Sequence, residues 1–365
     1  MAVNRNTKSS DSLKDGVSSK VTRRSFLNKS AALAFGFTVM PSYLALGKED
    51  SDGNLPPSKR INLGCIGCGG MGGGDIMELT KHGNAKPVAF CDVDFSRANE
   101  KVMKENPDVP RFTDFRVMLD KMGKDIDAVS IGTPDHTHFV AALDSMRRGK
   151  HVYVEKPLTH SFKEAEMLIA AEKKYGVLTE MGNFGHTSTG SVQFANMVKA
   201  GIVKDIVKIE AWKSPGDWYM DPAKHISEYP KGEPVPKSLD WDLWCGPVEK
   251  KPFSVMYHPF DWRGFYLYGN GMFGDWGAHI IDFPHDYLRL GLPSKLRAVK
   301  IEGHNHVIFP LGSHIEMHFP SRQGMPACDL SWRDDVDYMP TIDEQYWDKD
   351  AKGEPVKPRL GGAGT

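Results

Sequence analysis

Apolar and polar positions follow one pattern in the first half of the chain beyond residue 60. Short apolar runs alternate there with segments whose apolar residues recur at helical spacing. This alternation of buried strands with helices predicts a doubly wound parallel sheet, and so an α/β fold. The expected strands are 61–66, 87–91, 128–132, 151–155 and 178–181, and the expected helices are 75–82, 96–106, 114–122, 139–148 and 161–175.

Beyond residue 200 the pattern changes to separate strand-like runs around one helix and a tryptophan-rich, loop-rich stretch, 214–272. We therefore expect two domains, a Rossmann domain over 60–182 and an α+β domain over 183–365 with an open, mostly antiparallel sheet. The helix is expected at 276–290 and the strands at 203–213, 295–302, 306–309, 315–319 and 328–332.

The segment before the first domain has the pattern of an export signal. A polar, basic start leads into Thr22-Arg23-Arg24-Ser25-Phe26-Leu27, an apolar stretch over 31–46 and the small residues around Gly47. This order is typical of a twin-arginine signal peptide over 1–47, followed by a linker over 48–59. A membrane anchor is the alternative, but the interrupted apolar stretch is shorter than the roughly 20 residues that span a bilayer. We expect a periplasmic protein that the twin-arginine translocation machinery exports.

Composition and charge exclude some classes of function but do not identify one. The formal net charge is −1, and no basic patch alternates with aromatic residues, so nucleic acid is not an expected partner. There are five cysteines, of which Cys65 and Cys68 form a C-x-x-C. Because these two flank a glycine turn that needs small side chains, we interpret them as packing residues rather than a redox pair.

Glycines follow the first predicted strand in the pattern G-x-G-x-x-G. Asp92, at the end of the next strand, lies twenty-five residues after the first of them. Such glycines permit a tight turn, a close approach of backbone to a pyrophosphate and close packing of helix on strand, while the acidic residue accepts hydrogen bonds from a ribose. A carboxylate there repels a 2′-phosphate, so NAD is favoured over NADP; a chance glycine-rich loop is the alternative. The expected phosphate-loop contacts are Gly67, Gly69, Gly70, Met71 and Gly72.

Two short motifs follow later strands at the edge where ligands of parallel sheets bind. Residues 132–138 read G-T-P-D-H-T-H, which places Thr133 and Pro134 near the nicotinamide ribose and His138 at the start of a helix, as a cofactor-site or packing residue. Glu155 and Lys156 precede a proline, which restricts the backbone of the lysine. An ammonium at that edge can hold a substrate hydroxyl, although surface lysines after strands are common.

A third motif, G-D-W-G-A-H-I-I-D over 274–282, enters the predicted helix of the second domain. Asp275 and His279 are four residues apart and so share one helical face. The imidazole can accept a proton near neutral pH, and the carboxylate can orient a hydroxyl. His and Asp at this spacing also ligate zinc, but we expect no metal because a nicotinamide with a lysine and a histidine needs none.

These motifs in this order resemble the glucose–fructose oxidoreductase and inositol dehydrogenase (Gfo/Idh/MocA) family, and the leader is similar to that of its exported branch. The resemblance runs from residue 61 to about 289. It implies that Lys156 is the catalytic lysine and that Asp275 and His279 contact substrate. The segment 181–186 is similar to one that borders the sugar site in exported members, which implies substrate contacts for Asn183 and His186.

Two departures from the family pattern accompany this resemblance. Phe184 stands where exported members often have glutamine, so one polar substrate contact is missing. Relatives also continue the second sheet, whereas this chain stops in a glycine-rich tail, 358–365, that we expect neither to close a core nor to cap an edge strand. The sequence is therefore interpreted as truncated, and a homo-oligomer is expected because the open sheet face mediates pairing in this family.

The expected reaction is oxidation of a secondary hydroxyl of a sugar or glycoside, with His279 taking the proton, Lys156 stabilising the developing charge and NAD accepting the hydride. A tightly held cofactor suits a periplasm without an NAD pool. One alternative is redox-neutral glycoside cleavage by oxidation, elimination, hydration and reduction, as the resemblance to the family's NAD-dependent glycosidases implies. A second is a nucleotide-loaded sugar-binding protein without turnover.

Overall fold

The computed structural model describes residues 59–214, 225–322, 324–334, 338–358 and 360–365. The predicted signal peptide, 1–47, and nearly all of the predicted linker, 48–59, lie outside these residues. Within the described ranges, no helix is long and apolar enough to cross a membrane.

The first domain of the described chain is built on a parallel sheet of six strands in the order β3-β2-β1-β4-β5-β6. The strand order reverses direction between β1 and β4, which is the switch point beside which nucleotides bind in doubly wound sheets. The predicted Rossmann class is therefore confirmed. The strands are β1 Ile61–Ile66, β2 Ala85–Cys91, β3 Arg111–Phe112, β4 Ala128–Ile131, β5 His151–Glu155 and β6 Thr179–Gly182.

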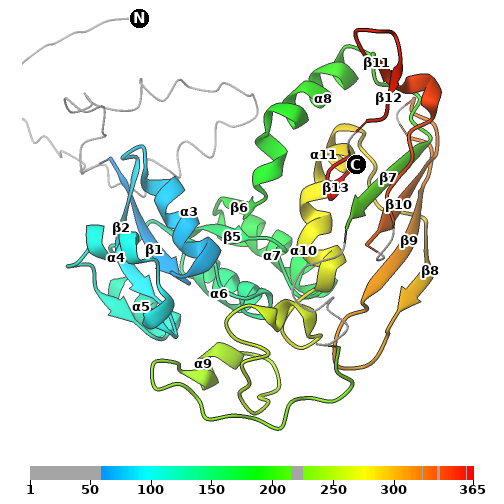
Figure 1. The fold of residues 1–365 in the computed structure, drawn as a ribbon. Helices are drawn as coiled ribbons and strands as arrows, with labels where there is room; N and C mark the ends of the chain where they lie inside the picture. Colours follow the sequence, from blue (N-terminus) through cyan, green and yellow to red (C-terminus); the bar gives the residue numbers. More distant parts are fainter. Residues whose placement is uncertain (1–58, 215–224, 323, 335–337, 359) are drawn as a thin grey trace, which may run out of the picture.

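Helices cover both faces of this sheet (Figure 1). One layer packs through Ile76 of α3 and Val102 of α4, and the other through Met118 of α5, Met146 of α6 and Leu168 of α7. Burial on both sides explains why the strands are apolar runs rather than alternating ones. The helices are α3 Gly70–Thr80, α4 Glu100–Glu105, α5 Phe115–Met122, α6 Asp135–Arg147 and α7 Phe162–Tyr175.

Three helices of the first domain have boundaries that differ from the predicted ones. Helix α3 begins at Gly70 and not at residue 75, because its glycines lower helix propensity and hid the first turn. Helix α6 begins at Asp135 and not at residue 139. The predicted helix 96–106 is a 3₁₀ turn, Phe95–Arg97, followed by the short α4. The capping box at the start of α7 and the left-handed glycine that ends it are confirmed.

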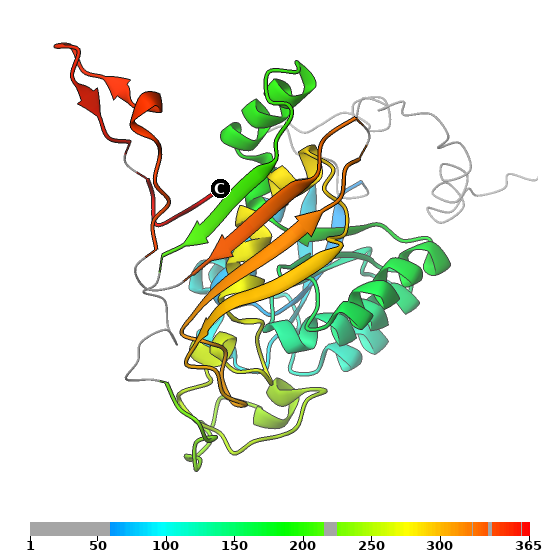
Figure 2. The same ribbon diagram turned by 90° about the vertical axis from the view of Figure 1, so that its right-hand side faces the viewer.

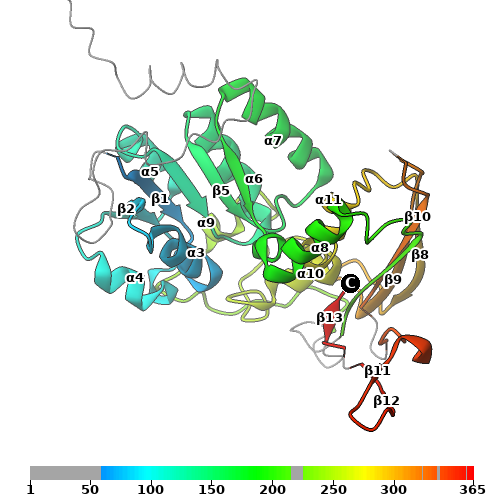
Figure 3. The same ribbon diagram turned by 90° about the horizontal axis from the view of Figure 1, so that it is seen from above.

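The second domain, in its described part, places helices against a sheet of five strands in the order β13-β7-β10-β9-β8, in which only β7 and β10 run parallel. Figure 2 shows this sheet face-on, and Figure 3 shows α10 between the two domains' sheets. The elements are α8 Thr189–Lys199, β7 Lys208–Lys213, α9 Trp241–Cys245, α10 Gly271–Ile280, α11 Asp282–Tyr287, β8 Lys295–Glu302, β9 Gly312–Phe319, β10 Cys328–Arg333, β11 Asp348–Lys349, β12 Pro355–Val356 and β13 Ala363–Gly364.

Several predictions for this domain need correction. The apolar run 306–309 is not a strand and contributes a single bridge, from Ile308 to Phe265. The predicted helix 276–290 is two helices, α10 and α11, and α8 was not predicted. Periodicity alone does not distinguish a short buried strand from an apolar loop. These errors therefore arise because the prediction used only the local pattern of apolar residues.

The expectation that the C-terminal glycines cannot pair with an edge strand is wrong. Strand β13 adds to the edge of the sheet, with Gly364 opposite Trp212 of β7. The Trp212 indole also donates from Nε1 to Gly361 O at 3.1 Å. A Cβ on Gly364 would lie 2.7 Å from the Trp212 ring, so glycine is what allows the backbone to approach.

The tryptophan-rich stretch forms an aromatic core of its own against the first domain. Trp241 and Trp244 stack at a ring-centroid distance of 4.5 Å and pack on buried Tyr268. The Asp240 amide donates to Val93 O at 2.9 Å, just past β2. This stretch therefore closes one side of the nucleotide-binding edge.

Candidate active site

A cavity of about 1660 Å³ lies between the carboxyl edge of the parallel sheet and the second domain. It reaches from the glycine loop after β1, past Thr133 and Lys156, to Asp275 and His279 on α10. Small-molecule sites usually measure roughly 300–1,000 Å³. The space therefore suits an elongated cofactor together with a second molecule.

The glycine loop is shaped for a pyrophosphate. Gly67 has φ +82°, and a Cβ there would lie 2.7 Å from the carbonyl of Gly132. A Cβ on Gly72 would come within 2.4 Å of Gly67 O, so the helix packs directly on the turn. Gly69 caps α3 without a side-chain hydrogen bond, and Gly69, Gly70 and Met71 line the cavity. The first N–H groups of α3 therefore fit a phosphate, as NAD requires.

Asp92 lines the same cavity at the tip of β2. Its Oδ2 accepts from Cys68 N at 2.7 Å and its Oδ1 from Asp94 N at 2.9 Å. Burial raises the pKa of this carboxyl, and the two amides oppose that effect. The carboxylate is thus oriented in the position from which the predicted ribose contact would be made.

The cysteines around this turn are packing residues, as predicted. Cys65 and Cys68 are fully buried, and burial raises the pKa of the Cys65 thiol to about 12. All five cysteines of the chain lie in its described part, and none is in a disulfide. A thiol held protonated in this way is unreactive.

The segment that begins with the G-T-P motif contributes two residues that line the cavity and one histidine that packs behind them. Thr133 and Pro134 line the cavity, with Pro134 at the N-cap of α6. His138 is buried behind them, with Nε2 2.7 Å from Thr133 O and Nδ1 2.8 Å from Pro157 O. Because both ring nitrogens face backbone carbonyls, His138 braces the two loops from behind and does not line the cavity.

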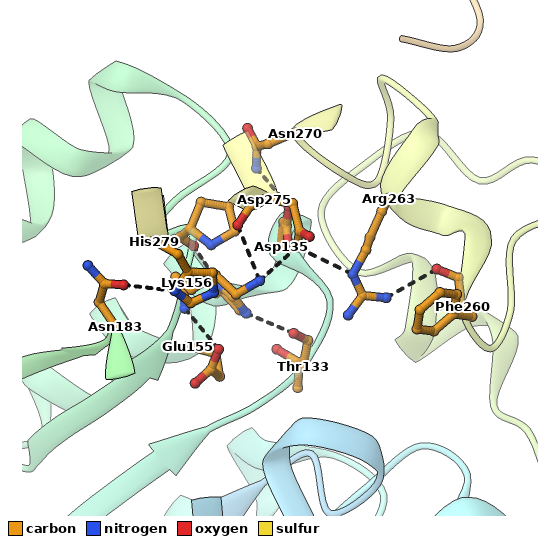
Figure 4. A network of polar contacts seen from close by, with 12 residues as sticks. Thr133, Asp135, Glu155, Lys156, Asn183, Phe260, Arg263, Asn270, Asp275 and His279 are labelled. Atoms are coloured by element: carbon orange, nitrogen blue, oxygen red, sulfur yellow. Dashed lines mark hydrogen bonds and ion pairs between the residues drawn. The ribbon is translucent and has the colours of Figure 1, made fainter. Parts of the chain in front are cut away.

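Lys156 and Asp275 form the centre of the site, although 119 positions separate them in sequence. Lys156 Nζ lies 2.8 Å from Asp275 Oδ1, and both side chains are nearly buried (Figure 4). Lys156 directly follows β5, and Asp275 lies in α10 and lines the same cavity. The ion pair holds the ammonium toward the cavity, where it can stabilise negative charge on a bound hydroxyl.

His279 lies one turn further along α10 and is oriented by Asn183. The Asn183 amide donates from Nδ2 to Ala278 O at 2.8 Å, which assigns Oδ1 as the atom 2.9 Å from His279 Nδ1. The ring therefore carries its proton on Nδ1 and its lone pair on Nε2. Burial lowers the pKa of His279 to about 4, and the Lys156 ammonium acts in the same direction. A neutral imidazole whose Nε2 carries the lone pair can accept a proton, although the lowered pKa makes it a weaker base than an ordinary histidine.

A buried acid group lies behind the lysine. Glu155 lines the cavity, and its Oε2 accepts from the Lys156 amide at 3.3 Å. Burial raises its pKa. A Cβ on Gly182 would lie 2.2 Å from Glu155 Oε1, so a glycine at the end of β6 makes room for this carboxyl.

Three polar residues of the site were not predicted. Asp135, in the first turn of α6, is fully buried and accepts from Asn270 Nδ2 at 2.9 Å. Arg263, in the tryptophan-rich stretch, reaches Asp275 Oδ1 with Nε at 3.5 Å. Asp135 follows a motif at the sheet edge and could have been inferred from that position, whereas Arg263 stands in a loop without any periodic signal.

One predicted substrate residue lies elsewhere. His186 does not line the cavity; its Nδ1 contacts Asp282 Oδ2 at 2.5 Å, and its ring packs near Tyr287. Asn183 acts through His279 and likewise does not line the cavity. No group of three or more His, Cys, Asp or Glu suited to a metal ion occurs among the described residues.

Comparison with known families agrees with this architecture. The model of the oxidoreductase family with an NAD-binding Rossmann fold, Gfo/Idh/MocA, matches residues 61–183, and the model of that family's C-terminal alpha/beta domain matches residues 189–305. The chain belongs to the Gfo/Idh/MocA oxidoreductase family.

Relatives of this Gfo/Idh/MocA protein include two enzymes of different description. It is 29% identical to a glycosyl hydrolase family 109 protein of Shewanella sp. (strain ANA-3), over 43% of this chain and 35% of that protein. It is 31% identical to an inositol 2-dehydrogenase of Rubrobacter xylanophilus, over 44% of this chain and 46% of that protein. The matched segments thus span less than half the length of each relative.

Solved structures share the fold. The WlbA dehydrogenase from Bordetella pertussis, solved in complex with NADH and UDP-GlcNAcA, superposes with a TM-score of 0.54 at 17% identity, over 78% of this chain and 74% of that one. At this identity the likeness concerns the fold of the Gfo/Idh/MocA protein and not its substrate.

Proposed function

We propose that this protein is an NAD-dependent oxidoreductase that oxidises a secondary hydroxyl of a sugar or glycoside. The observation that carries the proposal is the convergence of Lys156, Asp275 and an Nε2-basic His279 on one cavity with the glycine loop. Gly67, Gly69, Gly70, Met71 and Asp92 would hold the dinucleotide, with Thr133 and Pro134 nearer its nicotinamide end. When bound, NAD would supply the acceptor for the hydride that leaves the carbinol carbon.

The chain's own residues account for the proton and the charge. His279 Nε2 takes the hydroxyl proton while the C–H bond gives up its hydride, so the alcohol becomes a ketone. Lys156 donates to the same oxygen and stabilises its alkoxide character, and Asp275 holds the ammonium in place. Because the Lys156 and Asp275 side chains are nearly buried, their charges lie in a medium of lower effective dielectric constant than water, which strengthens the interaction with a bound oxygen.

We further propose that the cofactor is tightly held. The tryptophan-rich stretch contributes Trp244, His258 and Phe260 to the wall of the cavity that the glycine loop also lines. It is attached to the first domain through His136, whose Nε2 lies 2.8 Å from Trp244 O, and through the Asp240 to Val93 hydrogen bond. Release of a dinucleotide would require this wall to move, which favours turnover in place.

Export to the periplasm by the twin-arginine pathway is part of the same proposal and rests on the sequence of residues 1–47. A folded enzyme that keeps its nucleotide is suited to that route. A homo-oligomer is also proposed, on the family resemblance. Fractionation of cells for the full chain, with Arg23 and Arg24 each replaced by Lys in a matched variant, tests export; sedimentation tests the oligomeric state.

Redox-neutral glycoside cleavage is the second candidate. It is favoured by the similarity to a protein described as a glycosyl hydrolase of family 109. In that scheme the ring ketone acidifies the neighbouring C–H, the aglycone leaves by elimination, water adds, and the ketone is reduced again. The paired carboxylates of ordinary glycosidases are not required.

One experiment separates these functions. The purified protein is denatured to measure released NAD or NADH, and the native protein is assayed with a panel of nitrophenyl glycosides and free sugars. Accumulation of reduced cofactor with sugar supports the oxidoreductase. Aglycone release without net reduction, with solvent deuterium entering the carbon next to the oxidised one, supports the glycosidase. Binding of sugar without either product, in wild type and in Lys156→Ala alike, supports a binding protein.

A further inference from the structure

Two carboxyl groups, those of Asp75 and Glu155, are buried beside the reacting centre. Asp75 lies on α3, and Glu155 ends β5 and lines the cavity. Within the described chain neither carboxyl is in an ion pair, and Asp75 Oδ2 has no hydrogen-bond partner. The neighbouring ammonium, that of Lys156, is already paired with Asp275 at 2.8 Å. Groups buried in this way reduce stability, and a site that keeps them points to a role in function.

The end of the parallel sheet leaves room for both carboxyls. A Cβ on Gly182, at the end of β6, would lie 2.2 Å from Glu155 Oε1 and 2.7 Å from Tyr153 Oη. A Cβ on Gly132, directly after β4, would lie 3.6 Å from Asp75 Oδ2. The Tyr153 hydroxyl also donates to Glu155 Oε1 at 3.4 Å. The two carboxyls therefore approach the same edge of the sheet, one from α3 and the other from β5.

Each carboxyl affects the protonation of the other. Burial raises the pKa of Asp75 to about 7, and the nearby charge of Glu155 adds to this effect. Burial also raises the pKa of Glu155, while the Lys156 ammonium opposes that rise. The other titratable groups that act on these carboxyls or on the hydroxyl between them are Tyr153 on β5, Glu180 on β6 and Asp275 on α10. Because the two carboxyls interact, they titrate as a pair, and the pair gains or loses a proton near neutral pH.

The nicotinamide ring is a cation in NAD and neutral in NADH, so a charge beside it distinguishes the two forms. In the proposed reaction this ring meets the carbon whose oxygen Lys156 holds, and Glu155 directly precedes Lys156 (Figure 4). We propose that Asp75 and Glu155 form a proton-accepting pair that discriminates between the oxidised and the reduced cofactor. This inference rests on the proposed function for the binding of a nicotinamide dinucleotide.

Proton uptake by the pair accompanies reduction of the cofactor. The charged pair favours NAD, and a pair that has gained a proton loses part of that preference. During oxidation of the sugar, the carbinol carbon gives its hydride to the cofactor and the hydroxyl gives its proton to His279. The pair then takes one further proton from solvent and releases it when the cofactor is oxidised again. For a cofactor that turns over in place, this exchange keeps the charge of the buried site constant through the cycle.

Competition between the two nucleotides tests the proposal without any sugar present. The protein is equilibrated with known mixtures of NAD and NADH between pH 6 and pH 9, separated from free nucleotide and denatured. The amounts of the two released nucleotides then give the preference for NAD over NADH at each pH. In wild type this preference should decrease as the pH falls, by up to about tenfold per pH unit, the limit for one linked proton.

Three variants assign the effect to the pair. Glu155→Gln should lower the preference for NAD at pH 9 by about tenfold or more and remove most of its pH dependence, because the charge next to Lys156 is gone. Asp75→Asn keeps Glu155 but removes a neighbouring negative charge. The preference at pH 9 should therefore largely survive, and its decrease should move to lower pH. Glu180→Gln is the matched control, because Glu180 is exposed on β6 and does not line the cavity. It should change neither property.

The proposal is wrong if the wild-type preference does not depend on pH, if Glu155→Gln leaves it unchanged, or if Glu180→Gln alters it equally. Failure of the proposed function has a different signature. Binding of both nucleotides with the expected pH dependence, but no reduction of NAD by any sugar, contradicts the proposed reaction and leaves the pair intact. Sugar oxidation together with a pH-independent preference contradicts the pair and leaves the reaction intact. Binding of neither nucleotide contradicts both.

Discussion

Asn183 Oδ1 accepts a hydrogen bond from His279 Nδ1 at 2.9 Å, so a residue directly after the last strand of the parallel sheet sets the tautomer of an imidazole on α10. The amide itself is oriented by its contact with Ala278 O at 2.8 Å. The interface between the two domains thus determines which nitrogen of His279 is basic. In the proposed reaction, Asn183, which does not line the cavity, sets which nitrogen of His279 takes the proton.

Replacing Asn183 by leucine should lower kcat. Without an acceptor at Nδ1 the ring is free to adopt the other tautomer, and a loss of about 10- to 100-fold is expected, as for other residues that orient a reacting ligand or base. Steady-state kinetics with the best substrate measure this. Asn183→Asp is the matched variant: it keeps an acceptor, and its charge should raise the pKa of His279. Unchanged kcat in Asn183→Leu would contradict the assigned tautomer.

The pH dependence should reflect the depressed pKa of His279. Because burial lowers it to about 4, the imidazole stays neutral down to that pH, and kcat/KM should fall only as the pH approaches about 4 rather than at 6.5. Removing the nearby cation in Lys156→Met should raise the pKa of His279. Titration of the imidazole by nuclear magnetic resonance checks both expectations without requiring turnover, and an apparent pKa near 6.5 in wild type would refute the first.

Lys156→Met should also reduce turnover by about 100-fold or more, since it removes the donor that stabilises charge on the substrate oxygen. Lys163→Met is the matched control, because Lys163 is exposed on α7 and away from the cavity. Single-turnover reduction of the bound cofactor is the measurement. Equal rates of cofactor reduction in the two variants would show that Lys156 does not take part in the reaction.

Asp75 on α3 should be replaceable with a gain in stability. It is buried, its Oδ2 has no hydrogen-bond partner in the described structure, and burial together with nearby Glu155 raises its pKa from 3.8 to about 7. Between these values the folded state binds more protons than the unfolded state, so stability falls as the pH rises through this window. Asp75→Asn should therefore raise the free energy of unfolding by about 1–3 kcal/mol at pH 8, and by less at pH 5.

Urea unfolding at the two pH values tests this, with Asp108→Asn as the exposed control. An increase in the free energy of unfolding that is equal at both pH values would show that burial of the Asp75 charge does not cause the stabilisation.

The C-terminal tail should tolerate substitution at Gly361, which precedes strand β13, and not at Gly364 within it. A Cβ on Gly364 would lie 2.7 Å from the ring of Trp212, whereas one on Gly361 would meet its nearest atom, Ala363 O, at 3.5 Å. Gly364→Ala should cost about 1–3 kcal/mol through overpacking, and Gly361→Ala much less. Thermal unfolding of the two variants compares them directly. Equal Tm values would mean that β13 does not contribute to the folded sheet.

Much of the first domain could be predicted because its signals are local. An apolar run that ends in Gly67 or Asp92 indicates where a strand ends and which functional residue follows it. Because the strands are parallel, their carboxyl ends lie at the same edge of the sheet. The start of α3 was missed because Gly70 and its neighbours disfavour a helix in isolation; packing of α3 on the turn after β1 overrides that preference.

The second domain was less predictable because its contacts are long-range. The helical spacing of Asp275 and His279 was visible, but the position of Arg263 depends on how an aromatic loop packs on Trp262 and Phe260. The glycine tail carries no apolar pattern, yet it pairs with β7 through backbone groups that every residue has.

The sequence by itself determined the dinucleotide turn, the order of strands and helices in the first domain apart from the unpredicted two-residue β3, and the residue types that carry the proposed chemistry. These follow from sterics and periodicity among neighbours in the chain. Only the tertiary structure decided that Asn183 orients His279, that His186 lies away from the cavity, and that Arg263 joins Lys156 on Asp275. Such relations join residues far apart in sequence, and the packing of whole elements sets them.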